Sequence, residues 1–128
     1  MLLNQEGYKM LQKQAVILGT WDDHDYGLND GGEEYSMKEE SQQLLLDFLG
    51  VDKNDKRRKR EGVYYSELFS TNLGTIKIII LDTRYFRTAL AVSKIPGRRY
   101  QHNTYGEGTI LGEQQWKWLE QELESSKA

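Results

Sequence analysis

The sequence predicts a mixed α/β domain, because helical and strand-like patterns alternate along a chain of 128 residues. Apolar residues at three- and four-residue spacing indicate helices, and short runs of β-branched residues indicate strands. Hydrophobic residues make up 38% of the chain, charged residues 29%, and the formal net charge is −3. With three Trp, eight Tyr and three Phe, this composition excludes a fully disordered chain.

The first elements expected are a short helix and a buried strand. Residues 5–14 have helical spacing, and the side chains expected to face inward are Tyr8, Leu11 and Met10. The segment Ala15–Leu18 is short, continuously apolar and rich in branched side chains. Such a run is typical of a strand that is covered on both faces.

Residues 35–49 predict the clearest helix. Ser36 followed by Glu39 has the pattern of a capping box, in which each side chain satisfies a free backbone N–H group at the helix start. Gly50 is placed to end the helix. The apolar face is expected to consist of Leu44, Leu45, Phe48 and Leu49.

The second half predicts two strands, a long loop and a final helix. Residues 62–70 and 75–81 have strand composition, and a turn at 72–74 joins them. The second of these strands is apolar enough to be central in a sheet. Residues 88–109 are expected to form a loop, and such long loops are usually functional or disordered. Residues 113–124 have helical spacing through Trp116, Leu119 and Leu123.

Several classes of protein and site are excluded or disfavoured. The chain has no cysteine, which excludes disulfides, thiolate zinc sites and a cysteine nucleophile. No apolar run approaches the roughly 20 residues of a membrane-spanning helix, and residues 1–13 lack the apolar stretch of a signal peptide. The compartment stays open. The basic run 56–60 is interpreted as a solvated loop rather than a nucleic-acid patch, because no aromatic residue is interleaved with it.

The chemistry is expected directly after the first predicted strand, where three carboxylates and an imidazole follow one another. Two like charges ~4 Å apart cost roughly 4 kcal/mol at an effective dielectric constant of 20. The carboxylates can relieve this by raised pKa values, by pointing into water, or by binding a cation such as Ca, Mn, Fe or Zn. The alternative is an acidic turn whose carboxylates cap backbone N–H groups, with the imidazole exposed. These residues are Asp22, Asp23, His24 and Asp25.

This segment also partly fits a calcium loop of the EF-hand type, since Asp23, Asp25, Asn29 and Glu34 fall near its ligand positions. The sixth position of such a loop needs glycine for a sharp turn, and here it is Leu28. We therefore set the EF-hand aside.

The segment Thr20–Asp30 resembles the central motif of the PhoD-like (alkaline phosphatase D-type) metallophosphoesterases. Further segments resemble that family in the same order along nearly the whole chain. They are Ser41–Phe48, Arg57–Tyr64, Leu81–Arg87 and Leu111–Leu119. One motif alone would be a weak match, whereas an ordered series is specific.

The resemblance implies part of an αββα sandwich with a metal centre at the strand ends that hydrolyses phosphate esters. It implies Asp23, and less firmly Asp22, as metal ligands, and His24 as the group that stabilises the phosphoryl charge or protonates the leaving oxygen. The metals, Ca and Fe first with Mn or Zn as alternatives, would supply a hydroxide nucleophile. The expected substrate is a small phosphate monoester or diester.

Four further residues are secondary candidates. Asp25, Asn29 and Asp30 are candidates for an additional ligand or for a group that orients one. Arg84, just past a predicted strand, offers a bidentate fork to a phosphate oxygen. An ion pair with Asp82 is its alternative role, and the sequence favours that ion pair.

Members of this family are longer than 128 residues and carry further metal-binding segments on both sides of these motifs. We therefore expect residues 1–128 to be part of a PhoD-like domain whose N- and C-terminal parts are missing, so the fragment can be inactive alone. Two other functions stay open at this stage. One is a non-catalytic metal-binding module, and the other is an interaction fragment that uses the basic run 56–60. The oligomeric state is open as well.

Overall fold

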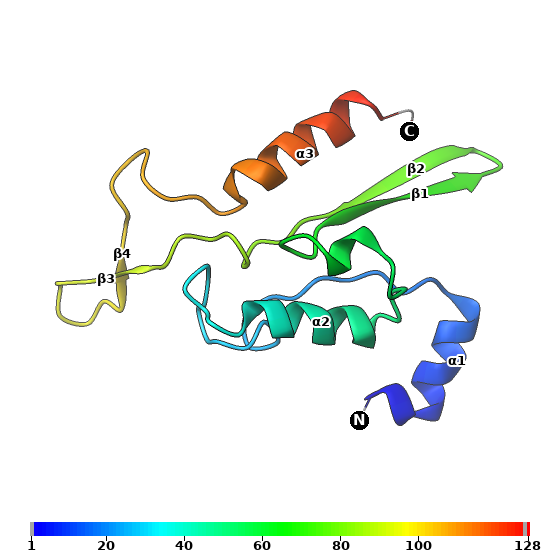
Figure 1. Cartoon of the computed structure of the whole chain (residues 1–128), viewed down its shortest axis with the longest axis horizontal. Helices are drawn as coiled ribbons and strands as arrows, with labels where there is room; N and C mark the ends of the chain where they lie inside the picture. Colours follow the sequence, from blue (N-terminus) through cyan, green and yellow to red (C-terminus); the bar gives the residue numbers. More distant parts are fainter. Residues whose placement is uncertain (1, 127) are drawn as a thin grey trace.

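The structure is a computed structural model that describes residues 2–126 and 128. Helices come first, four strands follow, and a last helix ends the described chain, which confirms the mixed α/β class (Figure 1). The strands form two separate two-stranded antiparallel sheets, and the αββα sandwich stays a prediction. In chain order the elements are η1 (Leu2–Asn4), α1 (Glu6–Gln14), α2 (Lys38–Phe48), η2 (Lys56–Arg58), β1 (Tyr65–Thr71), β2 (Gly74–Ile80), β3 (Ala91–Val92), β4 (Tyr100–Gln101) and α3 (Gly112–Glu124).

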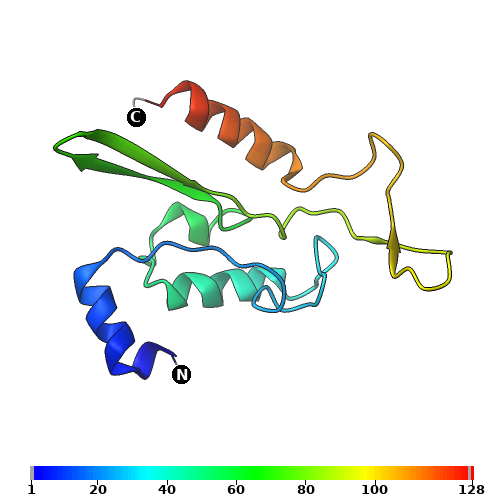
Figure 2. The ribbon, with the colours of Figure 1, turned by 180° about the vertical axis from the view of Figure 1, so that it is seen from behind.

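Helix α1 is present where the sequence predicts it, but two of its three expected inward residues face solvent. Tyr8 is half-buried and stacks on Phe48 of α2 with ring centroids 6.1 Å apart. Met10 and Leu11 are exposed, so the prediction for these two side chains is wrong. The reason is that α1 projects beyond the end of α2 instead of lying along it (Figures 1 and 2).

The segment Ala15–Leu18 is extended, but it is not a buried strand. Ala15 has φ −138° and ψ 148°, yet no strand within residues 2–126 pairs with this segment. Val16 is 68% exposed, and Ile17 and Leu18 are only half-buried. The prediction is wrong because side-chain composition favours extended backbone, whereas a strand also needs a neighbour that hydrogen-bonds to it.

Helix α2 starts later than predicted and without a capping box. Its N-cap residue is Met37, which makes no side-chain cap bond, while residues 35–37 form a turn. Tyr35 lies outside the helix because its ring packs edge-on against Tyr26, with centroids 5.3 Å apart. Gly50, with φ +68°, follows the helix end as expected. Of the predicted apolar face Leu44 is 70% exposed, and the buried residues of α2 are Gln42 and Leu46.

Strands β1 and β2 form the predicted hairpin, in a register that pairs Tyr65 with Ile80 and Thr71 with Gly74. One face of the hairpin is linked to α3, where Lys77 and Glu122 form an ion pair of 2.7 Å. On the other face Ile76 is 55% exposed. The prediction that β2 is a central strand is wrong, because β1 is its only strand partner in the part of the chain that the structure describes.

The last third of the chain has the predicted loop and helix, but of the helix's apolar residues Trp116 and Leu123 are 55% and 60% exposed, and its buried residues are Gly112 and Gln115. The expected loop 88–109 contains one small hairpin, β3 with β4, and helix α3 follows as predicted. In the described part of the chain no helix has both the length and the apolar character that crossing a membrane requires.

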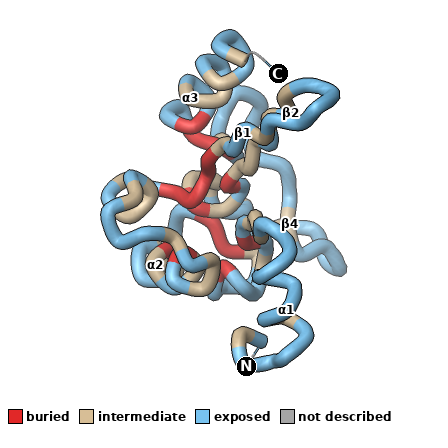
Figure 3. The backbone as a smooth tube through the Cα atoms, turned by 90° about the vertical axis from the view of Figure 1, so that its right-hand side faces the viewer, coloured by how far each residue is buried: buried red, intermediate tan, exposed pale blue. Residues whose placement is uncertain are grey.

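The core is aromatic and lies at the centre of the molecule (Figure 3). Trp21 packs edge-on against Tyr26 with centroids 4.9 Å apart, and Val63 and Tyr85 complete the cluster. Such aromatic pairs contribute about 0.5–1.5 kcal/mol each beyond the area they bury. The acidic segment therefore starts directly from the best-packed part of the protein.

Candidate functional site

A buried carboxylate, Asp82, joins the two segments that carry the candidate residues. Asp82 is 0% exposed, and its Oδ1 accepts a hydrogen bond of 2.9 Å from Nε1 of Trp21. It also accepts from the backbone N–H groups of Val63, Arg84 and Tyr85, at 2.9–3.0 Å. One side chain thereby fixes the residue before Asp22 and the backbone of Arg84 relative to each other.

The guanidinium group of Arg84 lies between the first two aspartates. Its Nη2 is 2.6 Å from Oδ1 of Asp22, and its Nη1 is 3.4 Å from Oδ1 of Asp23. The predicted ion pair between Arg84 and Asp82 is wrong, because Asp82 receives the backbone N–H of Arg84 and not its side chain. The positive charge of Arg84 relieves the repulsion between the neighbouring carboxylates that the sequence implies.

His24 is at the surface beside this cluster. Its side chain is 81% exposed, and Nδ1 lies 3.5 Å from Oδ2 of Asp23. Asp25 behaves as the acidic-turn alternative expects, since both of its carboxylate oxygens accept the backbone N–H of Asp22, at 3.0 and 3.1 Å. Asp25 also lines a hollow beside α2, so it faces a different part of the surface.

Asp30 is held by residues far away in the sequence. Its Oδ2 accepts hydrogen bonds of 2.9 Å from the hydroxyl of Tyr100 and from the Asn29 amide, and lies 2.9 Å from Nη1 of Arg99. The Tyr100 hydrogen bond, followed by the charge of Arg99, lowers the pKa of Asp30 below its ordinary value. Asp30 also has a left-handed backbone, with φ +56°.

The turn around Asp30 is further fixed from the segment that follows Arg84. Nη2 of Arg87 donates to the carbonyl oxygens of Asp30 and Gly31. The backbone N–H of Asp30 in turn donates to Oδ1 of Asp23. Arg99 and Tyr100 are functional contacts that the sequence does not predict, because they lie about 70 residues from Asp30 and carry no local signal.

The candidates are thus brought together in two groups. Asp22, Asp23 and Arg84 meet at one point with His24 beside them, while Asp30 contacts Tyr100 of β4 and Asn29 donates to Asp30. Carboxylate and imidazole fit hard or borderline metals in their chemistry. Within residues 2–126 and 128, however, no three such side chains are gathered into a group that could hold a metal ion.

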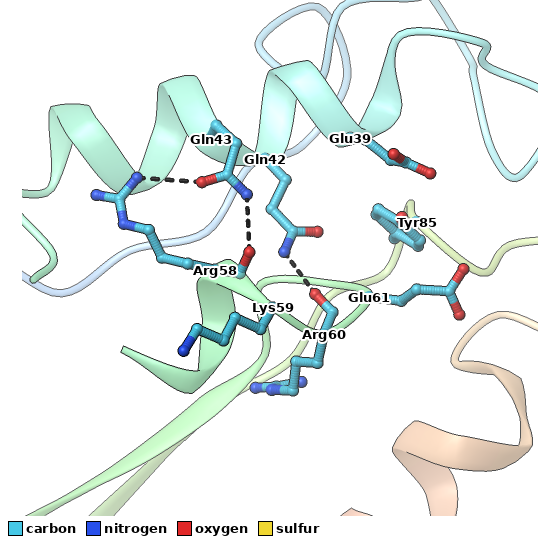
Figure 4. Close-up of a pocket in the computed structure, with 8 residues that line it drawn as sticks. All are labelled: Glu39, Gln42, Gln43, Arg58, Lys59, Arg60, Glu61 and Tyr85. Carbon is cyan, nitrogen blue, oxygen red and sulfur yellow. Dashed lines mark hydrogen bonds between the residues drawn. The ribbon is translucent and has the colours of Figure 1, made fainter. Parts of the chain in front are cut away.

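The basic run 56–60 lies elsewhere and is largely folded onto the protein. It borders a pocket of about 230 Å³ between α2 and η2, where Nε2 of Gln42 donates to the carbonyl oxygens of Arg57 and Arg60 (Figure 4). Arg57 pairs with Asp55 and Arg58 with Asp47, and these two arginine side chains are only 11% and 7% exposed. The prediction of a solvated loop is wrong for both, because each has an internal partner.

Comparison with known proteins gives one result. The family model described as PhoD-like phosphatase matches residues 3–128. No curated protein and no solved structure matches the chain.

Proposed function

The chain belongs to the PhoD-like phosphatase family, and on this basis we propose that the cluster of Asp22, Asp23, His24 and Arg84 is part of a site that hydrolyses phosphate esters. The family suggests a phosphoesterase function, and the proposal assigns it to named residues. The observation that carries it is the position of Arg84, whose guanidinium fork lies between two carboxylates on the surface of the aromatic core.

Arg84 is proposed to bind the phosphoryl group. A guanidinium group presents parallel N–H donors in a plane, which match two oxygens of a phosphate. The backbone N–H of Arg84 donates to the buried Asp82 carboxylate, so the main chain that carries the guanidinium group is held in place.

His24 is proposed to act on the leaving group. Its exposed imidazole is next to the Asp22–Arg84 pair, and the contact between Nδ1 and Asp23 favours a proton on that nitrogen. In the imidazolium form both ring nitrogens carry a proton, so Nε2 can donate its proton to the leaving oxygen or a hydrogen bond to the phosphoryl group, and the ring then keeps the proton on Nδ1 beside Asp23.

Members of the family are generally metal-dependent, and Asp22 and Asp23 are the proposed ligands in this chain. Ca and Fe are the ions proposed first, with Mn and Zn as alternatives. A bound ion would supply Lewis-acid stabilisation of the phosphoryl charge. Arg84, which contacts both carboxylates, would bind the phosphoryl group beside the ion that they hold. Asp25, Asn29 and Asp30 are secondary candidates for orienting this set.

The experiment is hydrolysis of an aryl phosphate monoester and an aryl phosphate diester by the purified chain, with each ion added in turn. His24→Ala should lower kcat at least about 100-fold, because general acid catalysis contributes that much or more. His102→Ala is the matched control, since His102 is an exposed histidine in another part of the chain. It should stay within about twofold of the wild type.

Two results would contradict the proposal. One is turnover that a chelator does not reduce, and the other is equal activity of the His24→Ala and His102→Ala variants. The ratio of monoester to diester turnover identifies the preferred substrate class.

A further inference from the structure

The 88–109 segment contacts the loop of the candidate site at Asp30. The β3–β4 hairpin of this segment lies at one end of the molecule, and its strand β4 begins with Tyr100 (Figure 1). The Tyr100 hydroxyl and Nη1 of Arg99 are each 2.9 Å from Oδ2 of Asp30. The guanidinium group of Arg99 also lies over the Tyr100 ring, 5.1 Å from its centroid. Two neighbouring side chains of the hairpin therefore hold one carboxylate oxygen of Asp30.

The backbone of Asp30 has a conformation that depends on such support. Its φ of +56° makes it the only residue other than glycine with a positive φ among the described residues. A left-handed backbone is unfavourable for a residue with a Cβ atom and persists where the surrounding contacts impose it. For Asp30 these contacts come from the hairpin and from Nη2 of Arg87, which donates to its carbonyl oxygen.

The N–H group of Asp30 is bonded to the residue that precedes His24. It donates to Oδ1 of Asp23, the oxygen that also lies 3.4 Å from Nη1 of Arg84. The other oxygen of the same carboxylate, Oδ2, is 3.5 Å from Nδ1 of His24. The orientation of the Asp23 carboxylate therefore links the His24 ring to the backbone of Asp30.

We propose that Asp30 is a positioning residue for Asp23 and His24, and that it acts through its backbone N–H. Tyr100 and Arg99 bind the carboxylate of Asp30, which is therefore engaged by the hairpin and is not a ligand of the metal ion. The 88–109 segment thereby sets the orientation of His24 without supplying a group that touches the substrate. The catalytic part of this inference rests on the proposed phosphoesterase function, whereas the positioning itself does not.

Amide hydrogen exchange tests the positioning without substrate or metal. Tyr100→Phe removes only the hydroxyl group, and the amide proton of Asp30 should then exchange at least about tenfold faster, because the turn opens more often. Tyr105→Phe is the matched control, since Tyr105 is a fully exposed tyrosine of the same segment, and it should leave that rate unchanged. Amide protons near Leu46 in the core should keep their rates in both variants.

Hydrolysis of the two aryl phosphates at saturating metal tests the consequence for the site. Tyr100→Phe should lower kcat at least about tenfold, as changes to groups that orient a ligand commonly do. KM should stay within about twofold, because Arg84 still binds the phosphate. Asp30→Asn keeps an acceptor oxygen for Tyr100 and tolerates the left-handed backbone, so it should retain more activity than Tyr100→Phe. A carboxylate that binds the metal ion predicts the opposite order.

The inference is overturned if the Asp30 amide exchanges equally fast in the Tyr100→Phe and Tyr105→Phe variants, or if exchange near Leu46 rises as much as at Asp30. In a chain that is active, a Tyr100→Phe variant with the kcat of the wild type overturns it as well. So does a greater loss of activity in Asp30→Asn than in Tyr100→Phe. A wild type that hydrolyses neither ester would contradict the proposed function, and the exchange rate of the Asp30 amide then still decides whether the hairpin holds this turn.

Discussion

Asp82 is the single residue on which the arrangement of the candidate site depends most. Its carboxylate is fully buried and receives one side-chain and three backbone hydrogen bonds. Asp82→Ala should lower the free energy of unfolding by about 3–5 kcal/mol, because it leaves buried donors without an acceptor. Asp82→Asn, which retains one acceptor oxygen, should cost less. Urea unfolding at a fixed protein concentration measures both.

The control for this prediction is Asp22→Ala. The Asp22 side chain is 83% exposed although it contacts Arg84 at 2.6 Å, and exposed ion pairs contribute about 0–1 kcal/mol. A loss for Asp82→Ala no larger than that for Asp22→Ala would show that the buried hydrogen bonds of Asp82 do not hold the two segments together.

Asp55 predicts a specific dependence of stability on pH. Its hydrogen bonds with Arg57, at 2.8–2.9 Å, lower the pKa of Asp55 to about 2 in the folded protein, against about 3.9 in an unfolded chain. A lowered folded-state pKa stabilises the protein above the unfolded value. This contribution, about 1–2 kcal/mol, is lost as the pH falls from about 4 toward 2.

Urea unfolding of the wild type and Asp55→Asn between pH 2 and pH 7 tests this. The difference in unfolding free energy should be constant above about pH 5 and should shrink toward zero near the folded-state pKa. In an Arg57→Gln background the same substitution should have little effect. A wild-type advantage that persists unchanged at pH 2.5 would be the contrary result.

At the scale of elements, two glycines allow the cost of a left-handed backbone to be measured apart from the cost of a steric clash. Gly50 after α2 and Gly62 before β1 both have a left-handed backbone, with φ +68° and +78°. A Cβ atom at Gly50 would meet nothing within 4 Å, whereas at Gly62 it would lie 2.8 Å from Cε2 of Phe86. Alanine should therefore cost about 1 kcal/mol at Gly50 and about 2–4 kcal/mol at Gly62.

Thermal or urea unfolding of the two alanine variants checks this difference. Equal losses would mean that Phe86 moves aside without cost and that only the backbone conformation matters. A loss at Gly50 greater than at Gly62 would contradict the assignment of the clash altogether.

The elements that the sequence predicted correctly are those whose signals are local. Helices α1 and α3 and the β1–β2 hairpin follow from residue spacing and turn residues within each segment. The start of α2 was wrong because Tyr35 packs on Tyr26, a contact that competes with the capping box. The strand at 15–18 was wrong for a similar reason, since strand pairing depends on a partner that its own residues do not encode.

The same limit applies to the candidate site. The grouping of Asp22, Asp23 and His24 could be seen in the sequence because the three are consecutive. The position of Arg84 between Asp22 and Asp23 spans about 60 residues, and the Tyr100–Asp30 contact spans 70. Such contacts arise because the core packs distant segments together and because residues 88–109 fold back onto Asp30. Local patterns of residue spacing do not predict either.

At the scale of the whole molecule, stability should be distributed unevenly. Helix α1 contains no buried residue and touches α2 through the stacking of Tyr8 on Phe48, whereas α2 contributes the fully buried Leu46. Amide protons in α1 should exchange at least about 100-fold faster than those near Leu46, because an isolated helix of nine residues is marginal in water. Exchange mapped by NMR measures this, and equal rates in the two helices would contradict it.

Gln115 gives the molecule tolerance to changes of length in the 88–109 segment. Its buried side-chain amide accepts from the N–H of Asp82 and donates to the C=O of the same residue, both at 2.8 Å, in the manner of a neighbouring peptide group. Gln115 therefore holds helix α3 at a fixed position relative to Asp82, just after the end of β2. The two ends of the intervening segment are also joined, since Thr88 donates its N–H to the carbonyl of Thr109 at 2.9 Å. Insertions and deletions between these ends that keep Arg99 and Tyr100 on Asp30 can therefore accumulate while Trp21, Asp82 and Arg84 stay in place.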